Sequence, residues 1–310
     1  MAIQKFYAHG KLLLTSEYFV LDGAEALALP TRFGQSLILN DSLQDTLRWQ
    51  SFDADGSLWF EGIFDFTRFN ALSSSDESVS QMLSTILKTA KNLQNQASSL
   101  HFSVKNTAIE THLTFPRYWG LGTSSTLIYN VAQWFEVNPY DLLKGTFGGS
   151  GYDIACAGAH SAIVYSIKEG KNIFRAVEFQ PEFKENLYFI YLDKKQNSRE
   201  GIARYREKAQ KLYPQYFDIF SEITQAMQNA TNLSSFEKLI KEHEKIVASI
   251  IKLPRAKALY FNDFWGEIKS LGAWGGDFVM ATSDRDVYTT KQYFREKGFN
   301  TILPFDEMIL

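Results

Sequence analysis

The first half of the chain alternates apolar and polar positions over short runs, a pattern typical of β-strands. Glycine, proline and other turn residues separate these runs, which cover residues 11–14, 18–21, 26–29, 35–39, 46–50 and 57–60. Asp22-Gly23 stands between two of the runs and predicts a hairpin turn, because glycine tolerates a positive φ. A later run at residues 109–115 predicts one more strand.

Apolar residues recur at helical spacing in the rest of the chain. The predicted helices cover residues 78–93, 127–135, 202–212, 216–230, 236–251 and 287–297, and further strands are predicted at 187–192, 278–282 and 300–303. His243 lies on the apolar stripe of residues 236–251, so we interpret it as a core residue rather than a ligand. Strands and helices are mixed in both halves, which predicts an α+β fold.

A length of 310 residues suggests two structural units, since a domain has about 100–200 residues. Charged residues and Pro181 interrupt the apolar runs between residues 167 and 187. We therefore expect one domain over residues 1–175 and a second over residues 176–310.

Composition excludes several classes of protein. With 45% hydrophobic residues the chain can bury a core, which excludes intrinsic disorder. One cysteine excludes a disulfide scaffold, and together with five scattered histidines it argues against a zinc site. A formal charge of −3 without a long basic run predicts no nucleic-acid partner. The first residues lack the pattern of a secretory signal, and the charge-free stretch 118–135 is too polar for a membrane span. We expect a cytoplasmic protein without a membrane partner.

The most informative segment is Gly-Leu-Gly-Thr-Ser-Ser at residues 120–125, which stands between a predicted strand and a predicted helix. Such a turn directs backbone N–H groups and the positive end of a helix dipole toward one point, which suits a phosphate group. The alternative is that the hydroxyl residues only cap the helix. The standard nucleoside-triphosphate loop is absent, and Ser125 stands where a dinucleotide fingerprint needs its third glycine.

Three more segments carry candidate chemistry, although each also has a structural explanation. Ser150-Gly-Tyr-Asp153 places one carboxylate in a polar turn, where it could cap a helix. Residues 272–277 form a glycine-rich turn before an apolar strand. Lys11 stands at the head of an apolar strand, where its ammonium could simply reach solvent.

Taken together and in this order, the four segments resemble the motifs of the GHMP kinases, and the resemblance spans nearly the whole chain. It implies an N-terminal domain like the second domain of ribosomal protein S5 and a C-terminal ferredoxin-like domain. It also implies ATP and Mg²⁺ as cofactors and phosphoryl transfer to a small-molecule alcohol or phosphate. The substrate-assigned group that residues 150–155 and 275–277 resemble most is the phosphomevalonate kinases, so an acceptor of the mevalonate or phosphomevalonate type is expected.

The resemblance also implies roles for individual residues. Asp153 and Lys11 match the catalytic pair, and Ser124 matches the hydroxyl that meets Mg²⁺. The residues expected to bind ATP are Gly120, Leu121, Gly122, Thr123, Ser124, Ser125, Gly275 and Gly276. Those expected at the acceptor are Glu17, Tyr18, Ser150 and Arg199, so replacing Arg199 by alanine should raise the KM for the acceptor. A homodimer is left open.

Two departures from the family pattern keep other functions open. Leu142 stands where the mevalonate kinases have a Mg²⁺-binding glutamate, and Trp274 replaces a glycine of the third motif, where an indole would crowd the phosphates unless it turns away. One alternative is therefore a nucleotide-binding protein that lost the chemistry. Others are a kinase for a sugar or an amino alcohol, and a decarboxylase of the same family.

Overall fold

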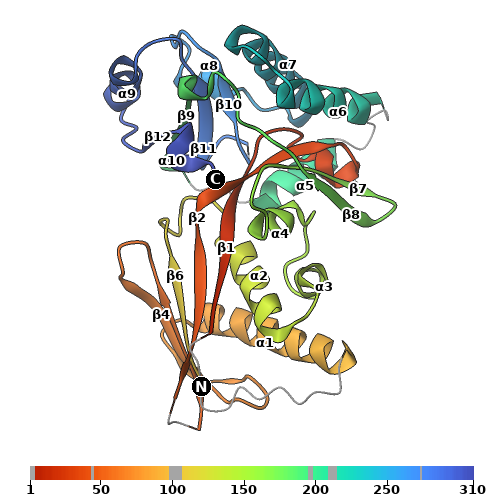
Figure 1. Ribbon diagram of the computed structural model, residues 1–310, viewed down its shortest axis with the longest axis vertical. Helices are drawn as coiled ribbons and strands as arrows, with labels where there is room; N and C mark the ends of the chain where they lie inside the picture. The colour runs from red at the N-terminus through yellow and green to blue at the C-terminus, as the bar shows by residue number, and fades with distance from the viewer. Residues whose placement is uncertain (1–3, 43–44, 98–106, 195–197, 209–214, 273) are drawn as a thin grey trace. The chain divides into compact units, whose positions relative to one another are not determined.

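The computed structural model describes residues 4–42, 45–97, 107–194, 198–208, 215–272 and 274–310 (Figure 1). By packing, the chain divides into two compact units that are not continuous in sequence. The first unit consists of Met1–Gly10, Phe33–Arg117 and Leu121–Gly158, and the second of Lys11–Arg32, Tyr118–Gly120 and Ala159–Leu310. The domain boundary expected near residue 175 stays a prediction.

A large mixed sheet and a small antiparallel sheet confirm the α+β class. The large sheet has the order β5-β4-β3-β6-β2-β7-β8, and β1 pairs with β2. Neighbouring strands β3 and β6 run parallel, with Arg48 opposite Ala108, whereas β2 and β6 run antiparallel, with Leu37 opposite Thr111. Its strands are β1 (Gln4–Leu13), β2 (Ala26–Asp41), β3 (Leu47–Phe52), β4 (Leu58–Phe64), β5 (Ala71–Ser74), β6 (Thr107–Leu113), β7 (Ile163–Lys168) and β8 (Lys171–Ala176).

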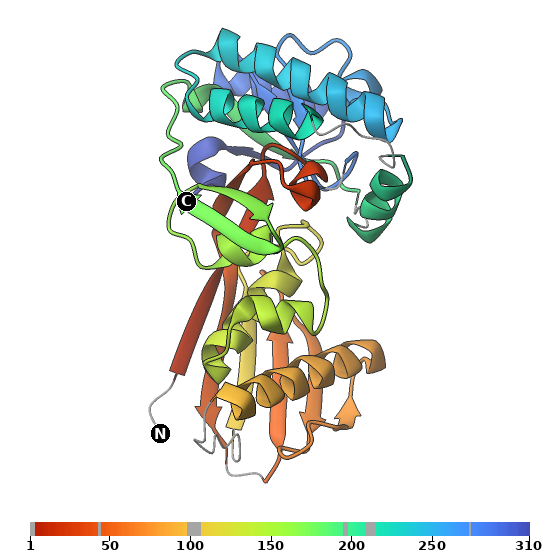
Figure 2. The same cartoon turned by 90° about the vertical axis from the view of Figure 1, so that its right-hand side faces the viewer.

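Helices of the first unit cover one face of its strands (Figure 2). They are α1 (Glu77–Ala97), α2 (Thr123–Phe135), α3 (Pro139–Lys144) and α4 (Tyr152–Ala157). Their apolar stripes and the inward side chains of the strands, Trp49 and Phe64 among them, form one buried cluster. Both long helices expected in this half, near residues 78–93 and 127–135, are confirmed as α1 and α2.

The small sheet lies in the second unit and has the order β10-β11-β9-β12. Its strands are β9 (Leu187–Tyr191), β10 (Ile268–Ser270), β11 (Phe278–Thr282) and β12 (Ile302–Pro304). The helices are α5 (Ser198–Lys208), α6 (Gln215–Gln228), α7 (Leu233–Ile251), α8 (Ala256–Tyr260), α9 (Val287–Glu296) and α10 (Phe305–Met308). All five residues of β9 are buried, because Ile190 packs in the cluster with α8 and α9 while Phe189 meets Phe305 of α10.

One predicted element is wrong. Residues 18–21 were expected to form a strand, but Phe19–Asp22 forms a short 3₁₀ helix that begins after Tyr18, whose φ is 69°. A strand would send consecutive residues to opposite faces, whereas Phe19 and Val20 are both fully buried in the second unit. Gly23 ends this helix at a φ of 101°, so the glycine makes a turn but not a hairpin. No helix among the described residues is both long and apolar enough to cross a membrane.

Candidate active site

Helix α2 of the first unit begins without a side-chain cap. Its N-cap residue is Gly122, with a φ of 98°, and no side chain in the described part of the chain bonds the first backbone N–H groups there. The hydroxyls of Ser125 and Thr126 lie inside the first turn and donate to the Gly122 carbonyl at 2.8 and 3.1 Å, while Ser124 is exposed. The hydroxyl residues therefore do not serve as an N-cap, and the positive end of the helix can accept an anion.

Three of the four sequence motifs meet within the second unit. The Lys11 Nζ atom donates to the Gly120 carbonyl oxygen at 3.0 Å. A Cβ atom on Gly120 would lie 2.4 Å from the carboxylate carbon of Asp277, so only glycine allows Asp277 to approach this closely. Gly120 also has a φ of 71°, which disfavours every other residue. The structure thus brings together an ammonium group, a glycine-turn carbonyl and a carboxylate from segments far apart in sequence.

The indole of Trp274 is turned into the protein interior. Its side chain is 4% exposed and packs with Phe19 in an apolar cluster of the second unit, and its Nε1 donates to the Pro254 carbonyl at 3.0 Å. Gly275, with a φ of 86°, and Gly276 complete the turn that leads into β11. The crowding expected from an indole in this motif is therefore relieved by burial.

Asp153 and Ser150 lie at the start of α4 in the first unit. Gly151, with a φ of 84°, is the N-cap residue of this short helix, and the Asp153 carboxylate is half-buried. Burial raises the pKa of Tyr140 above its ordinary value, and the charge of Asp153 raises it further. The carboxylate therefore lies close enough to the phenol of Tyr140 for their charges to interact.

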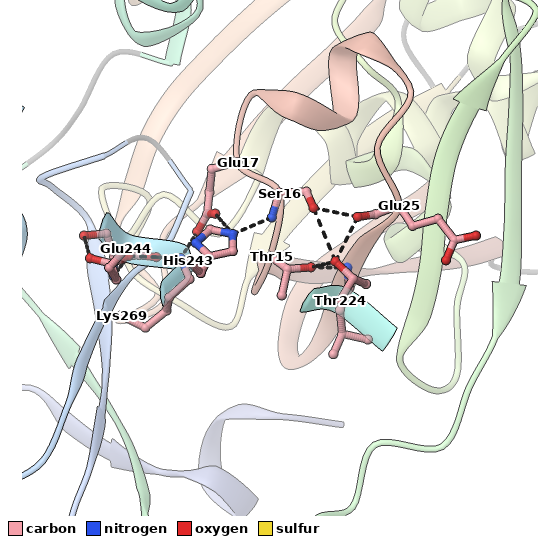
Figure 3. A network of polar contacts seen from close by, with 10 residues as sticks. Thr15, Ser16, Glu17, Glu25, Thr224, His243, Glu244 and Lys269 are labelled. Carbon is pink, nitrogen blue, oxygen red and sulfur yellow. Dashed lines mark hydrogen bonds and ion pairs between the residues drawn. The ribbon is translucent and has the colours of Figure 1, made fainter. Parts of the chain in front are cut away.

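Glu17 belongs to a buried polar cluster that the sequence did not reveal (Figure 3). It is 1% exposed, and its Oε1 atom accepts a hydrogen bond from Lys269 of β10. The Lys269 ammonium also lies 3.3 Å from Glu244 of α7, and the Ser270 backbone N–H donates to Glu244 at 3.0 Å. Four ionisable side chains, Glu17, His243, Glu244 and Lys269, are thus buried together. The signal available in the sequence was a charged residue within an apolar pattern, at Glu244 and at Lys269.

The geometry favours a proton on Glu17. The Nε2 atom of His243 accepts the Ser16 backbone N–H at 2.9 Å, so a neutral imidazole carries its proton on Nδ1. Glu17 Oε2 lies 3.2 Å from the same Nε2 atom, and two lone pairs would repel each other at this distance. A proton on Glu17 removes the repulsion and leaves Lys269 and Glu244 as a neutral pair. Burial raises the pKa of Glu17 to about 7, against the opposing effect of Lys269.

Helices α6 and α7 hold the strained segment that carries Glu17. Ser16 has a φ of 60°, in the left-handed region that favours glycine. Besides the bond to His243, its hydroxyl donates to the Glu25 carbonyl and lies 3.3 Å from Thr224 of α6 (Figure 3). The neighbouring Thr15 hydroxyl is 2.7 Å from Thr224. These buried bonds offset the backbone strain.

Two further positions concern the expected metal ligand and the expected acceptor contact. Leu142 is fully buried in the apolar cluster of the first unit, and its neighbour Asp141 is exposed. Arg199 lies in the first turn of α5, but its side chain is outside the described residues, so its expected contact with an acceptor stays a prediction.

Comparison with known proteins shows which solved structures share this fold. No protein-family model and no curated protein sequence matches the chain. Among solved structures, the mevalonate kinase of Methanococcus jannaschii has a TM-score of 0.69 at 14% identity, with 97% of each chain covered. A phosphomevalonate kinase of Streptococcus pneumoniae has a TM-score of 0.67 at 17% identity, covering 96% of this chain and 98% of that one. The chain has the GHMP kinase fold.

A third solved structure is similar over the same span. The Lin0012 protein of Listeria innocua has a TM-score of 0.72 at 15% identity, covering 98% of this chain and 97% of that chain. The resemblance seen in the four motifs is therefore confirmed for the fold over nearly the whole chain. At these identities the choice of substrate depends on this chain's own residues.

Proposed function

We propose that this protein is an ATP-dependent small-molecule kinase, whose acceptor is an alcohol or phosphate of the mevalonate or phosphomevalonate type. The observation that carries the proposal is the meeting of Lys11, Gly120 and Asp277 in a fold that mevalonate kinases share. One of the similar structures is a phosphomevalonate kinase in complex with phosphomevalonate and AMPPNP, which supports both the cofactor and the acceptor.

The nucleotide phosphates would bind at the uncapped start of α2. There the backbone N–H groups of the first turn can donate to phosphate oxygens, and Gly122 allows close approach. The binding residues are Gly120, Leu121, Gly122, Thr123, Ser124, Ser125, Gly275 and Gly276. The exposed Ser124 hydroxyl would be the protein ligand for Mg²⁺, whose preference for water and phosphate oxygens would let it do without a glutamate at position 142.

Asp153 and Lys11 carry the chemistry in this proposal. Phosphoryl transfer depends mainly on positioning and on the stabilisation of charge. The half-buried Asp153 carboxylate would accept or orient the proton of the acceptor hydroxyl, and the Lys11 ammonium would neutralise charge on the transferred group. Tyr18, Ser150 and Arg199 are proposed to contact the acceptor, and Glu17, buried against Lys269, would support this part of the site.

The experiment is an assay of ADP release by the purified protein over mevalonate, phosphomevalonate, galactose and an amino alcohol. We expect turnover with an acid of the mevalonate type, and mass analysis of the product should show a gain of one phosphoryl group without loss of CO₂. Asp153→Asn should lower kcat by about 10²–10⁴-fold, because a general base contributes that much. The matched control is Asp141→Asn, an exposed carboxylate of α3, which should leave kcat unchanged. Equal kcat values for both variants would remove Asp153 from catalysis.

One observation favours a second function. Leu142 buries a hydrocarbon side chain where a kinase of this fold could place a metal-binding carboxylate, so a nucleotide-binding protein with weak or no activity is the alternative. The same assay separates the two. Binding of AMPPNP without ADP release from any acceptor would favour the alternative.

A further inference from the structure

A cavity of about 570 Å³ lies beside α5, entirely within the second unit. This volume is in the range of sites for small molecules. One side is apolar and aromatic, with Tyr18, Trp274 and Ile251, and the other is a charged face of α5 with two acids and two bases, Glu200, Arg204, Glu207 and Lys208. A mixed lining of this kind suits a small molecule with a short hydrocarbon part and a charged end.

The aromatic side of the cavity is fixed by hydrogen bonds and ring stacking. The Tyr18 hydroxyl accepts the Trp274 backbone N–H at 3.1 Å, and its ring stacks on Tyr205 with the centroids 5.7 Å apart. The Trp274 indole is fixed by its bond to the Pro254 carbonyl. Both rings are therefore held by contacts inside the unit.

Gly201 brings α5 against this aromatic side. A Cβ atom at position 201 would lie 2.6 Å from the Tyr18 hydroxyl oxygen, closer than real side chains come. Glycine in a helix lowers its stability by about 0.5–1 kcal/mol relative to alanine. Its presence in α5 is explained by this close approach.

The charged side chains of α5 that the structure describes differ in whether they form an ion pair. Lys208 forms an ion pair with Glu207 at 2.7 Å, and Arg206 on another face of the helix pairs with Asp22. Arg204 lines the cavity and is exposed, and among the described residues it forms no ion pair. A guanidinium group in such a position matches the two oxygens of a carboxylate or phosphate.

Two chain segments that line the cavity also carry Lys11 and Asp277, which meet at Gly120 in the same unit. Tyr18 follows Lys11 in the segment Lys11–Arg32, and Trp274 stands in the turn that ends with Asp277. Lys11 and Asp277 both contact Gly120. A ligand that contacts Tyr18 and Trp274 therefore lies against the same two segments that supply the Lys11 ammonium and the Asp277 carboxylate.

We propose that this cavity binds the phosphoryl acceptor by its anionic group, a carboxylate or phosphate held by Arg204, with the hydrocarbon part of the acceptor against Tyr18 and Trp274. Arg204 then determines specificity for anionic acceptors over neutral sugars. The inference rests on the proposed function for the identity of the ligand as an acceptor, whereas the binding of the anion can be measured without any turnover.

The test is calorimetric titration of the full chain with mevalonate, phosphomevalonate and galactose. Wild-type protein should bind at least one of the two anions and should bind galactose more weakly. Arg204→Ala should weaken anion binding about tenfold or more, because a charged hydrogen bond is lost. The anion affinity of Arg204→Lys should fall between those of wild type and Arg204→Ala, since lysine keeps the charge but not the paired donors. Arg206→Ala, an exposed arginine on the same helix outside the cavity, is the control and should bind like wild type.

The outcomes are distinct for the two proposals. The cavity proposal is overturned if wild-type protein binds neither anion, if galactose binds as tightly, or if Arg204→Ala and Arg206→Ala bind alike. Anion binding that depends on Arg204 without ADP release would support the cavity and contradict the kinase. ADP release with galactose alone would support a kinase and contradict the cavity. Thermal unfolding of each variant shows that it is folded, and Arg204→Gln replaces the alanine variant if that one is not.

Discussion

At the scale of single residues, the buried cluster around Glu17 shows how burial changes acid–base behaviour. Lys269 alone would keep Glu17 ionised, but full burial and the nearby Glu244 act in the opposite direction, and the pKa of Glu17 rises to about 7. The pKa of His243 lies well below its ordinary value, because burial and the charge of Lys269 both disfavour the imidazolium. The native cluster is therefore neutral overall when Glu17 carries its proton.

This protonation predicts how stability depends on pH. A carboxyl group whose pKa is higher in the folded state binds its proton more tightly there, so its contribution is complete below pH 4.5 and is lost as the pH rises to about 7. At about 1.36 kcal/mol for each of the 2.5 pH units between 4.5 and about 7, the loss is at most about 3–4 kcal/mol. We expect the free energy of unfolding of wild-type protein, relative to that of Glu17→Gln, to fall over this range.

Urea unfolding of both proteins at several pH values measures the difference. His243 contributes in the opposite sense, since its lowered pKa gives stability that is lost as the pH falls below 6.5, but this contribution is present in both proteins and cancels. A difference that stays constant from pH 4.5 to 7 would show that Glu17 is ionised in the native protein.

At the scale of elements, the sequence predicted those parts whose burial is periodic. The long helices α1 and α7 have a clear apolar stripe, and both were found close to their predicted bounds. The strands β5 and β8 were missed because all their residues are exposed, so no alternation marks them. Helix α3 was also missed, although Asn138 before Pro139 is a start signal, and the Asn138 side chain does cap this helix.

The candidate site, too, was predicted only in part from the sequence. Motif spacing identified Lys11, Gly120 and residues 272–277, which the structure brings together. Arg204 was not found, because a solvated arginine on a polar helix has no pattern that separates it from its neighbours. Lys269 was not found either, because its partners Glu17 and Glu244 are distant in sequence and only the tertiary fold makes them neighbours.

Helix α3 provides a prediction about the missing metal ligand. Leu142 faces the apolar cluster of the first unit, so Leu142→Glu would bury a carboxylate rather than restore a Mg²⁺ site. We expect the free energy of unfolding to fall by about 3 kcal/mol or more, because burying an unpaired charge is costly. Denaturant unfolding measures this, with Asp141→Glu on the exposed side as the control. If Leu142→Glu were as stable as wild type and reached full activity at a lower Mg²⁺ concentration, position 142 would not be a core position.

Helix α5 provides another prediction. In most helices Gly→Ala stabilises by about 0.5–1 kcal/mol, but Gly201→Ala should destabilise, because the new Cβ atom meets the Tyr18 hydroxyl at 2.6 Å. In a Tyr18→Phe background the nearest atoms are ring carbons at 3.1 and 3.2 Å, so the penalty should shrink. A double-mutant cycle of unfolding free energies gives the coupling between the two positions. Additive effects would mean that α5 does not press on Tyr18.

At the scale of the whole molecule, fold and function rest on different observations. The fold is shared with kinases over nearly the full chain at 14–17% identity, so the chemistry depends on individual residues. Lys11, Gly120 and Asp277 meet within one unit, whereas the start of α2 and Asp153 belong to the other. A measurement on the intact protein is therefore needed to show that a nucleotide uses the start of α2.

Ligand-linked stability supplies that measurement. A ligand that binds only the native state at about a hundredfold excess over its Kd stabilises it by about 2.7 kcal/mol, so Mg-AMPPNP should raise the midpoint of thermal unfolding by several degrees. Gly122→Ala should reduce this increment, because an alanine side chain at a φ of 98° distorts the turn that would receive the phosphates. Gly170→Ala is a matched control, since Gly170 has a φ of 72° in the turn between β7 and β8 with nothing within 4 Å of an added Cβ atom. Both variants should unfold at lower temperature than wild type without ligand, but only Gly122→Ala should lose the increment. If both keep it in full, the nucleotide does not bind at the start of α2.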